Sequence, residues 1–247
     1  KRINRSVSVP FVRGDRESEN ALTELPGTKK EAEEIFKCFS DGGQRNIKPN
    51  LYEGKTATEA SLKAQSGNNI GILHIGTHGF YDATTDGDNV FSKNTNVSQH
   101  LTTEDKVLLK SGLFFSGAQN AINGMEIPDG VDDGVLTAQE IAYLDFRKVG
   151  LVTLSACQTG LGDVSQEGVY GLQRGFKKAG AGTILMSLWK VDDEATSMLM
   201  TEFYRLWNEG ASKYEALEKA KEKVRNTKGF ENFKYWAAFI MLDGIDN

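Results

Sequence analysis

The chain has 247 residues, 39% of them hydrophobic and 26% charged, and its formal net charge is −5. This length fits one sizeable domain with a substantial core, and the mildly acidic balance lacks the basic stripe that is typical of a nucleic-acid-binding protein. No run of about 18 apolar residues is present that would span a membrane. Two cysteines in a chain of this size do not make a disulfide framework, so we expect a reducing, cytoplasmic setting.

Short β-branched runs alternate with helical patterns in the first third of the chain, which indicates parallel strands joined by crossover helices. Two threonine–glutamate pairs, Thr28 with Glu31 and Thr56 with Glu59, have the spacing of a capping box and predict helix starts at these threonines. The expected elements are a strand at 6–12, a helix at 29–39, a strand at 48–53, a helix at 57–66 and a buried strand at 69–75.

Residues 82–135 are polar and rich in Gly, Asp and Asn. We interpret them as an insertion, with a hairpin at 106–116, inside one domain that covers 1–247. Two acidic clusters in this region lack the ligand spacing of an EF-hand, so we expect solvated loops and no metal. The loop composition of 84–131 favours a regulatory segment that moves. Because the chain starts at Lys1, without Met, we expect it to be a fragment of a longer protein.

The second half of the chain continues the alternation of strands and helices. Capping signals predict helix starts at Thr137, at Asp192 or Asp193, and at Ser212. The expected elements are helices at 138–145, 167–179, 193–207 and 213–226, and strands at 150–156, 183–188 and 236–242. The pattern predicts an α/β fold with a mostly parallel central sheet.

Two of the predicted central strands end in reactive residues, His78 and Cys157. Ligands of parallel sheets bind beyond the carboxyl ends of the strands. If these two strands are neighbours, a thiol and an imidazole face each other there, as nucleophilic catalysis by a thiolate requires. Gly79 follows the histidine and lets the chain turn without a Cβ, and we expect the N–H groups of Gly79 and Cys157 to bind an oxyanion.

Each of these residues also has a structural interpretation. A cysteine at a strand end is commonly a buried packing residue, and a histidine there is commonly satisfied within the core. His74 lies four residues before His78, but apolar neighbours and the missing H-E-x-x-H pattern make it a core residue rather than a metal ligand.

The chain resembles the CHAT family, caspase-like peptidase domains that are commonly fused to tetratricopeptide repeats. The resemblance covers about 24 to 242 and departs from the family mainly between His78 and Cys157, at 84–100 and 113–131. It is carried by the stretches ILHIGTHGFYD, LVTLSACQTGLGDV, GVYGLQRGFKKAGAGTILMSLWKVDDEAT and YWAAFIML.

The resemblance implies a caspase-like three-layer α/β/α sandwich with a His78/Cys157 dyad. By similarity to separases, Asp193, or else Asp192, would receive a basic side chain before the scissile bond. Either aspartate is equally well explained as a helix cap. Ser155 and Ser187 would line the same pocket, and Trp189 would form an apolar wall beside an extended substrate strand.

These expectations combine into a cysteine endopeptidase that cuts a protein or peptide after a basic residue. We expect no cofactor, no nucleic-acid or membrane partner, and regulation by a fused repeat domain or an activating partner. Two alternatives stay open: a catalytically silent scaffold with the same fold, and a thiol hydrolase that acts on small molecules. Reactivity of the Cys157 thiol separates the enzymes from the scaffold.

Overall fold

The structure is a computed structural model that describes residues 22, 25–81, 102, 107–155, 158–159 and 166–243. The strand expected at 6–12, the acidic cluster at 82–88 and Cys157 lie outside the described residues. Within the described part of the chain, no helix is both long and apolar enough to cross a lipid bilayer.

Four strands form sheet A, in the order β1-β5-β7-β8. The first three strands are parallel, and β8 is antiparallel to β7. The strands are β1 (Ile72–Ile75), β5 (Leu151–Leu154), β7 (Thr183–Ser187) and β8 (Phe239–Leu242). The sheet confirms the expected α/β fold, and each of its strands falls within a range predicted from β-branched apolar runs.

Alternating residues of sheet A pack into two separate hydrophobic clusters, as the two-residue period of a strand requires. In β7, Ile184 and Met186 belong to one cluster, whereas Leu185 between them belongs to the other. All three side chains are fully buried. Sheet A is therefore covered on both faces, which gives the chain three layers.

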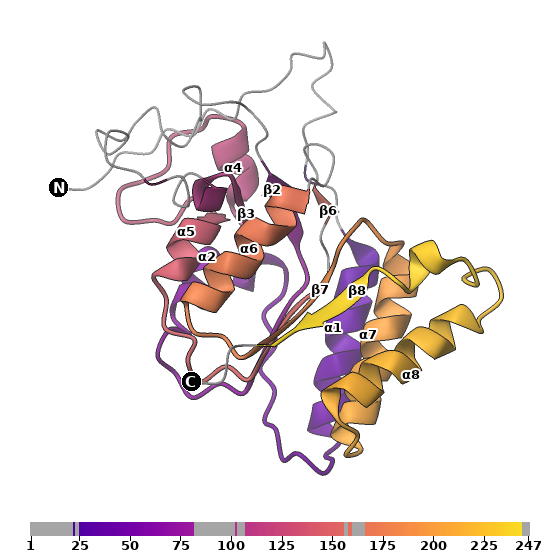
Figure 1. Cartoon of the computed structure of the whole chain (residues 1–247). Helices are drawn as coiled ribbons and strands as arrows, with labels where there is room; N and C mark the ends of the chain where they lie inside the picture. Colours follow the sequence, from indigo (N-terminus) through magenta and orange to yellow (C-terminus); the bar gives the residue numbers. More distant parts are fainter. Residues whose placement is uncertain are drawn as a thin grey trace.

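Three helices cover one face: α1 (Pro26–Ser40), α7 (Asp193–Asn208) and α8 (Lys213–Arg225). They lie together on one side of β7 and β8, and α6 and its neighbours lie on the other side (Figure 1). The elements of that second side are α2 (Glu59–Lys63), α4 (Ala118–Ile122), α5 (Ala138–Ala142) and α6 (Gln166–Lys178). Two short 3-10 turns, η1 (Gly54–Thr56) and η2 (Phe233–Tyr235), complete the described elements.

A second sheet, sheet B, has the order β4-β3-β2-β6. It consists of β2 (His78–Tyr81), β3 (Ser111–Phe114), β4 (Val135–Thr137) and β6 (Gln158–Thr159). β3 is antiparallel to both β2 and β4, and β6 is parallel to β2. Residues 111–137, which the polar composition assigned to an insertion, therefore build two strands and α4 into the fold.

Several local predictions are wrong. Residues 48–53 form no strand, and β3 pairs with β2 and β4 rather than within a hairpin at 106–116. Helix α1 begins at Pro26, so Thr28 lies inside its first turn and does not cap it. Thr58, not Thr56, caps α2. The caps at Thr137, Asp192 and Ser212 are confirmed by side-chain bonds to the first turn of each helix.

Candidate active site

His78 lies just beyond the carboxyl end of the parallel sheet. Strand β1 ends at Ile75, Gly76 and Thr77 follow, and His78 is the first residue of β2. The chain thus leaves sheet A and enters sheet B between these residues. The histidine is 7% exposed. It occupies the edge at which ligands of parallel sheets bind.

The chain segment from β5 follows the same route beside it. The N–H of Ser155, directly after β5, donates to the carbonyl oxygen of Ile75 over 3.1 Å. Three residues later, Gln158 is the parallel register partner of His78. Both described neighbours of the 156–157 pair are therefore attached to the segment that carries His78. Cys157 itself is not among the described residues.

Gly79 lies inside β2, opposite Leu113 of β3 and beside Thr159 of β6. A Cβ at this position would stand 3.5 Å from the carbonyl oxygen of Gly112, an ordinary contact distance. The expectation that glycine is needed here for a turn is wrong, because the residue is part of a strand.

Two buried serines follow neighbouring strands of sheet A. Leu154 of β5 is in register with Met186 of β7, so Ser155 and Ser187 come next on adjacent strands. They are 4% and 2% exposed. Among the described residues, the Ser155 Oγ has no hydrogen-bond partner, although the hydroxyl of a buried serine normally has one.

The two aspartates at the start of α7 have different positions. Asp192 is the N-cap, and its Oδ1 accepts hydrogen bonds from the N–H groups of Glu194 and Ala195 at 3.0 and 3.1 Å. Asp193 is the first helical residue and packs against the first turn of α1. A Cβ on Gly27 would lie 2.8 Å from the Cβ of Asp193. The cap interpretation therefore applies to Asp192.

Trp189 connects the segment after β7 to the segment before β8. Its indole N–H donates to the carbonyl oxygen of Lys234 over 3.0 Å. The N–H of the preceding residue, Leu188, donates to the carbonyl oxygen of Ala238 over 2.9 Å. Leu188 is 36% exposed. The two segments form an apolar rim beyond the end of β7.

The first turn of α1 has a role at the site that the sequence did not indicate. A Cβ on Gly76 would stand 2.2 Å from the Thr28 methyl carbon and 3.3 Å from the Ser155 Oγ. Gly27 of the same turn packs against Asp193. This turn thus touches both the His78 connection and the start of α7. The capping-box spacing of Thr28 and Glu31 concealed this role, because Thr28 faces the sheet instead of capping the helix.

His74 is a core residue, as expected. Its Nε2 lies 2.8 Å from Oε1 of Glu31 on α1, and its Nδ1 lies 3.2 Å from the Tyr204 hydroxyl on α7. That hydroxyl also lies 2.7 Å from Oγ1 of Thr153 on β5. Burial raises the pKa of Tyr204. The network joins β1 and β5 to the helices above them.

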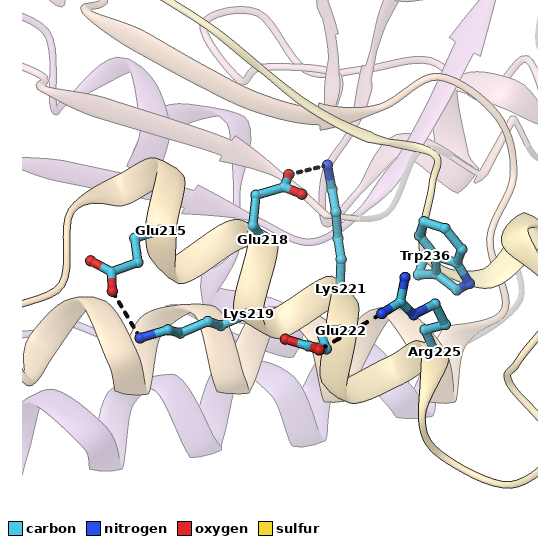
Figure 2. Close-up of a pocket in the computed structure, with 7 residues that line it drawn as sticks. All are labelled: Glu215, Glu218, Lys219, Lys221, Glu222, Arg225 and Trp236. Atoms are coloured by element: carbon cyan, nitrogen blue, oxygen red, sulfur yellow. Dashed lines mark hydrogen bonds and ion pairs between the residues drawn. The ribbon is translucent and has the colours of Figure 1, made fainter.

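A separate hollow of about 400 Å³ lies on α8, bounded at one end by Trp236 (Figure 2). Its charged side chains pair with one another along the helix: Glu215 with Lys219, Glu218 with Lys221, and Glu222 with Arg225. The Arg225 guanidinium stands over the Trp236 ring. Because these charges already neutralise each other, the hollow is a weaker candidate than the sheet edge. No group of three metal-ligating side chains occurs among the described residues.

Comparison with known proteins shows the family to which the chain is similar. The model of the CHAT domain family matches residues 2–244. The mouse protein named Tetratricopeptide repeat protein 28 is 35% identical over 109 residues, which is 44% of this chain and 4% of that protein. The human protein of the same name is 34% identical over 108 residues, with the same two shares. The chain matches only a small part of the length of these relatives.

Proposed function

The chain belongs to the CHAT domain family, and we propose that it is a caspase-like cysteine endopeptidase with Cys157 as nucleophile and His78 as its acid–base partner. The observation that carries the proposal is the parallel pairing of His78 with Gln158. Cys157 is bonded to Gln158, and consecutive Cα atoms are about 3.8 Å apart, so this pairing supports a nucleophile beside the histidine strand. A thiol and an imidazole are the pair that thiolate catalysis needs.

The proposed reaction follows from these two groups. The imidazole of His78 takes the thiol proton, and the Cys157 sulfur attacks the scissile carbonyl carbon. The N–H groups of Gly79 and Cys157 stabilise the oxyanion that forms. The imidazolium then gives its proton to the departing amine, leaving a thioester. Water, deprotonated by His78, hydrolyses the thioester and restores the thiol.

Asp193 is the proposed acceptor of a basic side chain before the scissile bond. The first turn of α1 contacts Asp193 at Gly27 and packs against Gly76, beside the buried Ser155. These two contacts support a pocket that carries both groups. Ser187 follows the adjacent strand and would line the same pocket. Asp192 is the second candidate, and its Oδ1 accepts two backbone hydrogen bonds as the N-cap of α7.

Trp189 is the proposed wall for an extended substrate. Its bond to Lys234 fixes the indole nitrogen, and the neighbouring Leu188 remains partly exposed. A peptide lying along this rim would pair with backbone near 187–190.

The proposed partner is a repeat domain that controls access to the site. Two relatives are named for tetratricopeptide repeats, and the matched segment of this chain covers 4% of their length. The proposed substrate is a protein or peptide, and the repeat domain would regulate its cleavage.

Cleavage of a peptide panel tests the proposal. Peptides that carry Arg, Lys, Leu, Met or Asp before a reporter bond are incubated with the wild type and with Cys157→Ala, His78→Ala, Asp193→Ala and Asp192→Ala. We expect cleavage after Arg or Lys, abolished by the first two substitutions. Asp193→Ala should lose the basic preference, and Asp192→Ala should keep it. Cleavage only after Asp would contradict the proposed preference of the Asp193 pocket for a basic side chain. Equal cleavage by the wild type and Cys157→Ala would contradict the role of Cys157 as nucleophile.

A further inference from the structure

A side-chain hydrogen bond ties the connection between β1 and β2 to a third strand. Thr77, the residue before His78, donates its hydroxyl hydrogen to the carbonyl oxygen of Phe114, the last residue of β3. Thr77 lies outside both strands that it connects. Its hydrogen bond therefore connects the carboxyl end of β1 in sheet A to β3, the strand that precedes α4.

The bond continues the pairing of β2 with β3 beyond the last rung of the ladder. The antiparallel pairs run from Tyr81 opposite Ser111 to Gly79 opposite Leu113. The next pair in this register would be His78 and Phe114. The Thr77 hydroxyl reaches the carbonyl of Phe114 and so fixes the histidine strand to β3 at this point.

The acceptor is itself firmly held. The Phe114 side chain is buried and packs on Phe80, with 4.9 Å between ring centroids. The N–H of Phe115 donates to the carbonyl oxygen of Gly134 over 2.7 Å. The N–H of Ser116 donates to the carbonyl oxygen of Ala57 over 2.9 Å. Because the Phe114 carbonyl is held in place, its hydrogen bond with Thr77 restricts the position of Thr77.

We propose that Thr77 is a positioning residue that holds His78 in line with the Cys157 segment. This inference rests on the proposed function of the two residues. On one side, the parallel pairing with Gln158 fixes the distance of the His78 backbone from the nucleophile segment. On the other side, the Thr77 hydroxyl fixes the same strand to β3. Without that hydroxyl, the attachment of the histidine strand to β3 ends at the Gly79–Leu113 pair, and the Phe114 carbonyl loses this hydrogen bond.

The constraint also links the site to residues 111–137. The carbonyl that Thr77 uses belongs to the strand that continues into α4 and β4. A displacement of this region relative to sheet A would reach the His78 strand through the β2–β3 pairing and, nearest to His78, through the Thr77 hydroxyl. Thr77 is therefore the place where the region between the two reactive residues would control the histidine.

Thiol alkylation measures the constraint without requiring a known substrate. The rates at which iodoacetamide modifies Cys157 and Cys38 are measured by peptide mass spectrometry, between about pH 5 and pH 9, in the same 247-residue chain. An ordinary thiol has a pKa of about 8.5 and slows tenfold for each pH unit below it, whereas a thiol paired with a charged imidazole keeps reacting. Wild-type Cys157 should keep a plateau at low pH.

The variants separate positioning from folding. Thr77→Val and Thr77→Ala remove the hydroxyl, Thr77→Ser keeps it, and Thr227→Val removes a comparable threonine–backbone bond, 2.8 Å long, to the carbonyl of Lys223 on α8. Cys38 is the internal control, because burial raises its pKa and it contacts Asn208 at the end of α7. Cys38 is partly exposed in the folded chain, so a modification rate above that of the wild type reports an opening of the fold around it.

We expect the Val and Ala variants to alkylate Cys157 about ten- to a hundredfold more slowly at pH 6, with Cys38 unchanged. Thr77→Ser and Thr227→Val should match the wild type. A preserved plateau in the Val and Ala variants overturns the positioning role. So does a loss of plateau that is accompanied by faster Cys38 modification. A wild-type chain without any plateau contradicts the dyad itself, which is a different failure from the other two.

Discussion

Glu31 of α1 and His74 of β1 form a buried pair, with 2.8 Å between Oε1 and Nε2. The Glu31 side chain is 2% exposed and the His74 side chain 13% exposed. The pair lies one helical turn after Thr28 and four residues before His78. It attaches the helix that covers the sheet edge to the strand that leads into the site.

Substituting Glu31 by Ala should destabilise the fold by about 1 to 3 kcal/mol, because it leaves the His74 ring nitrogen buried without the neighbouring carboxylate. Glu33→Ala is the matched control. Glu33 is exposed on the same helix and lies 3.9 Å from Lys29, so its loss should cost well under about 1 kcal/mol. Urea unfolding measures both. Equal stabilities for the two variants would show that the buried pair does not join helix and strand.

Gly175 on α6 should not tolerate a side chain. A Cβ there would stand 2.6 Å from the carbonyl oxygen of Ala138, at the start of α5. The usual gain of helix propensity from Gly to Ala, up to about 1 kcal/mol, is outweighed by backbone displacement that costs about 1 to 3 kcal/mol.

The control for this substitution is Gly71→Ala, because a Cβ at Gly71 meets nothing within 4 Å. Thermal unfolding should show a lower melting temperature for Gly175→Ala and little change for Gly71→Ala. A stabilised Gly175→Ala variant would contradict the close packing of α6, the helix that follows the nucleophile segment.

Glu202 should make the fold sensitive to acid. Hydrogen bonds from Arg205, and a further one from Lys223, lower the pKa of this carboxyl to about 2. A lowered folded-state pKa gives stability that is present above the unfolded value of about 4.3 and is lost as the pH falls toward 2. Glu202→Gln should remove roughly 1 to 2 kcal/mol at pH 7 and flatten the acid limb of the stability curve. The exposed control is Glu218→Gln. If the acid limb is unchanged in Glu202→Gln but flattened in Glu218→Gln, Glu202 is not the source of the acid sensitivity.

Ionisation of Glu59 should affect the stability in the opposite direction to that of Glu202, because the pKa of Glu59 is raised. Burial raises its pKa to about 7, against opposing contributions from Lys63. Its Oε2 accepts a hydrogen bond from the N–H of Gly134 over 2.9 Å. A raised folded-state pKa gives stability that is full below about pH 4.3 and is lost as the pH rises through 7.

Glu59→Gln keeps an acceptor for the Gly134 N–H and removes the titration. Between about pH 4.5 and pH 7, the stability of the wild type should fall by on the order of 2 kcal/mol relative to that of the variant. Urea unfolding at several pH values measures the difference. A constant difference across this window would contradict the raised pKa.

The sequence predicted the part of the fold that depends on strand and helix periodicity. The four strands of sheet A and helices α5 to α8 follow from apolar runs and capping residues. The caps of α5, α7 and α8 were predicted because each lies directly before an amphipathic segment.

Sheet B was not predicted, since its strands are short and its register depends on residues far apart in the chain. β6 has two residues, and β3 belongs to a stretch whose polar surroundings indicated a loop. The role of the α1 first turn was hidden for a similar reason. Only tertiary packing shows that Thr28 faces Gly76 and that Gly27 meets Asp193.

The candidate site was predicted in part. That His78 follows a central strand was evident from the apolar run before it. The attachment of Gln158 to His78 requires the chain to switch from one sheet to the other after both β1 and β5, which no local pattern encodes. Thr77 carries no sequence signal beyond its place before a histidine.

Covalent labelling tests the pairing of His78 with Cys157 most directly. A peptidyl chloromethyl ketone that ends in Arg, and a matched one that ends in Asp, are incubated with the wild type and with His78→Ala. The thiolate displaces chloride to form a thioether, and the modified cysteine is identified by mass spectrometry. We predict that the Arg compound modifies Cys157 of the wild type, that His78→Ala reacts at least about a hundredfold more slowly, and that Cys38 stays unmodified. Equal modification of Cys157 in both proteins, or modification of Cys38 alone, would contradict the dyad.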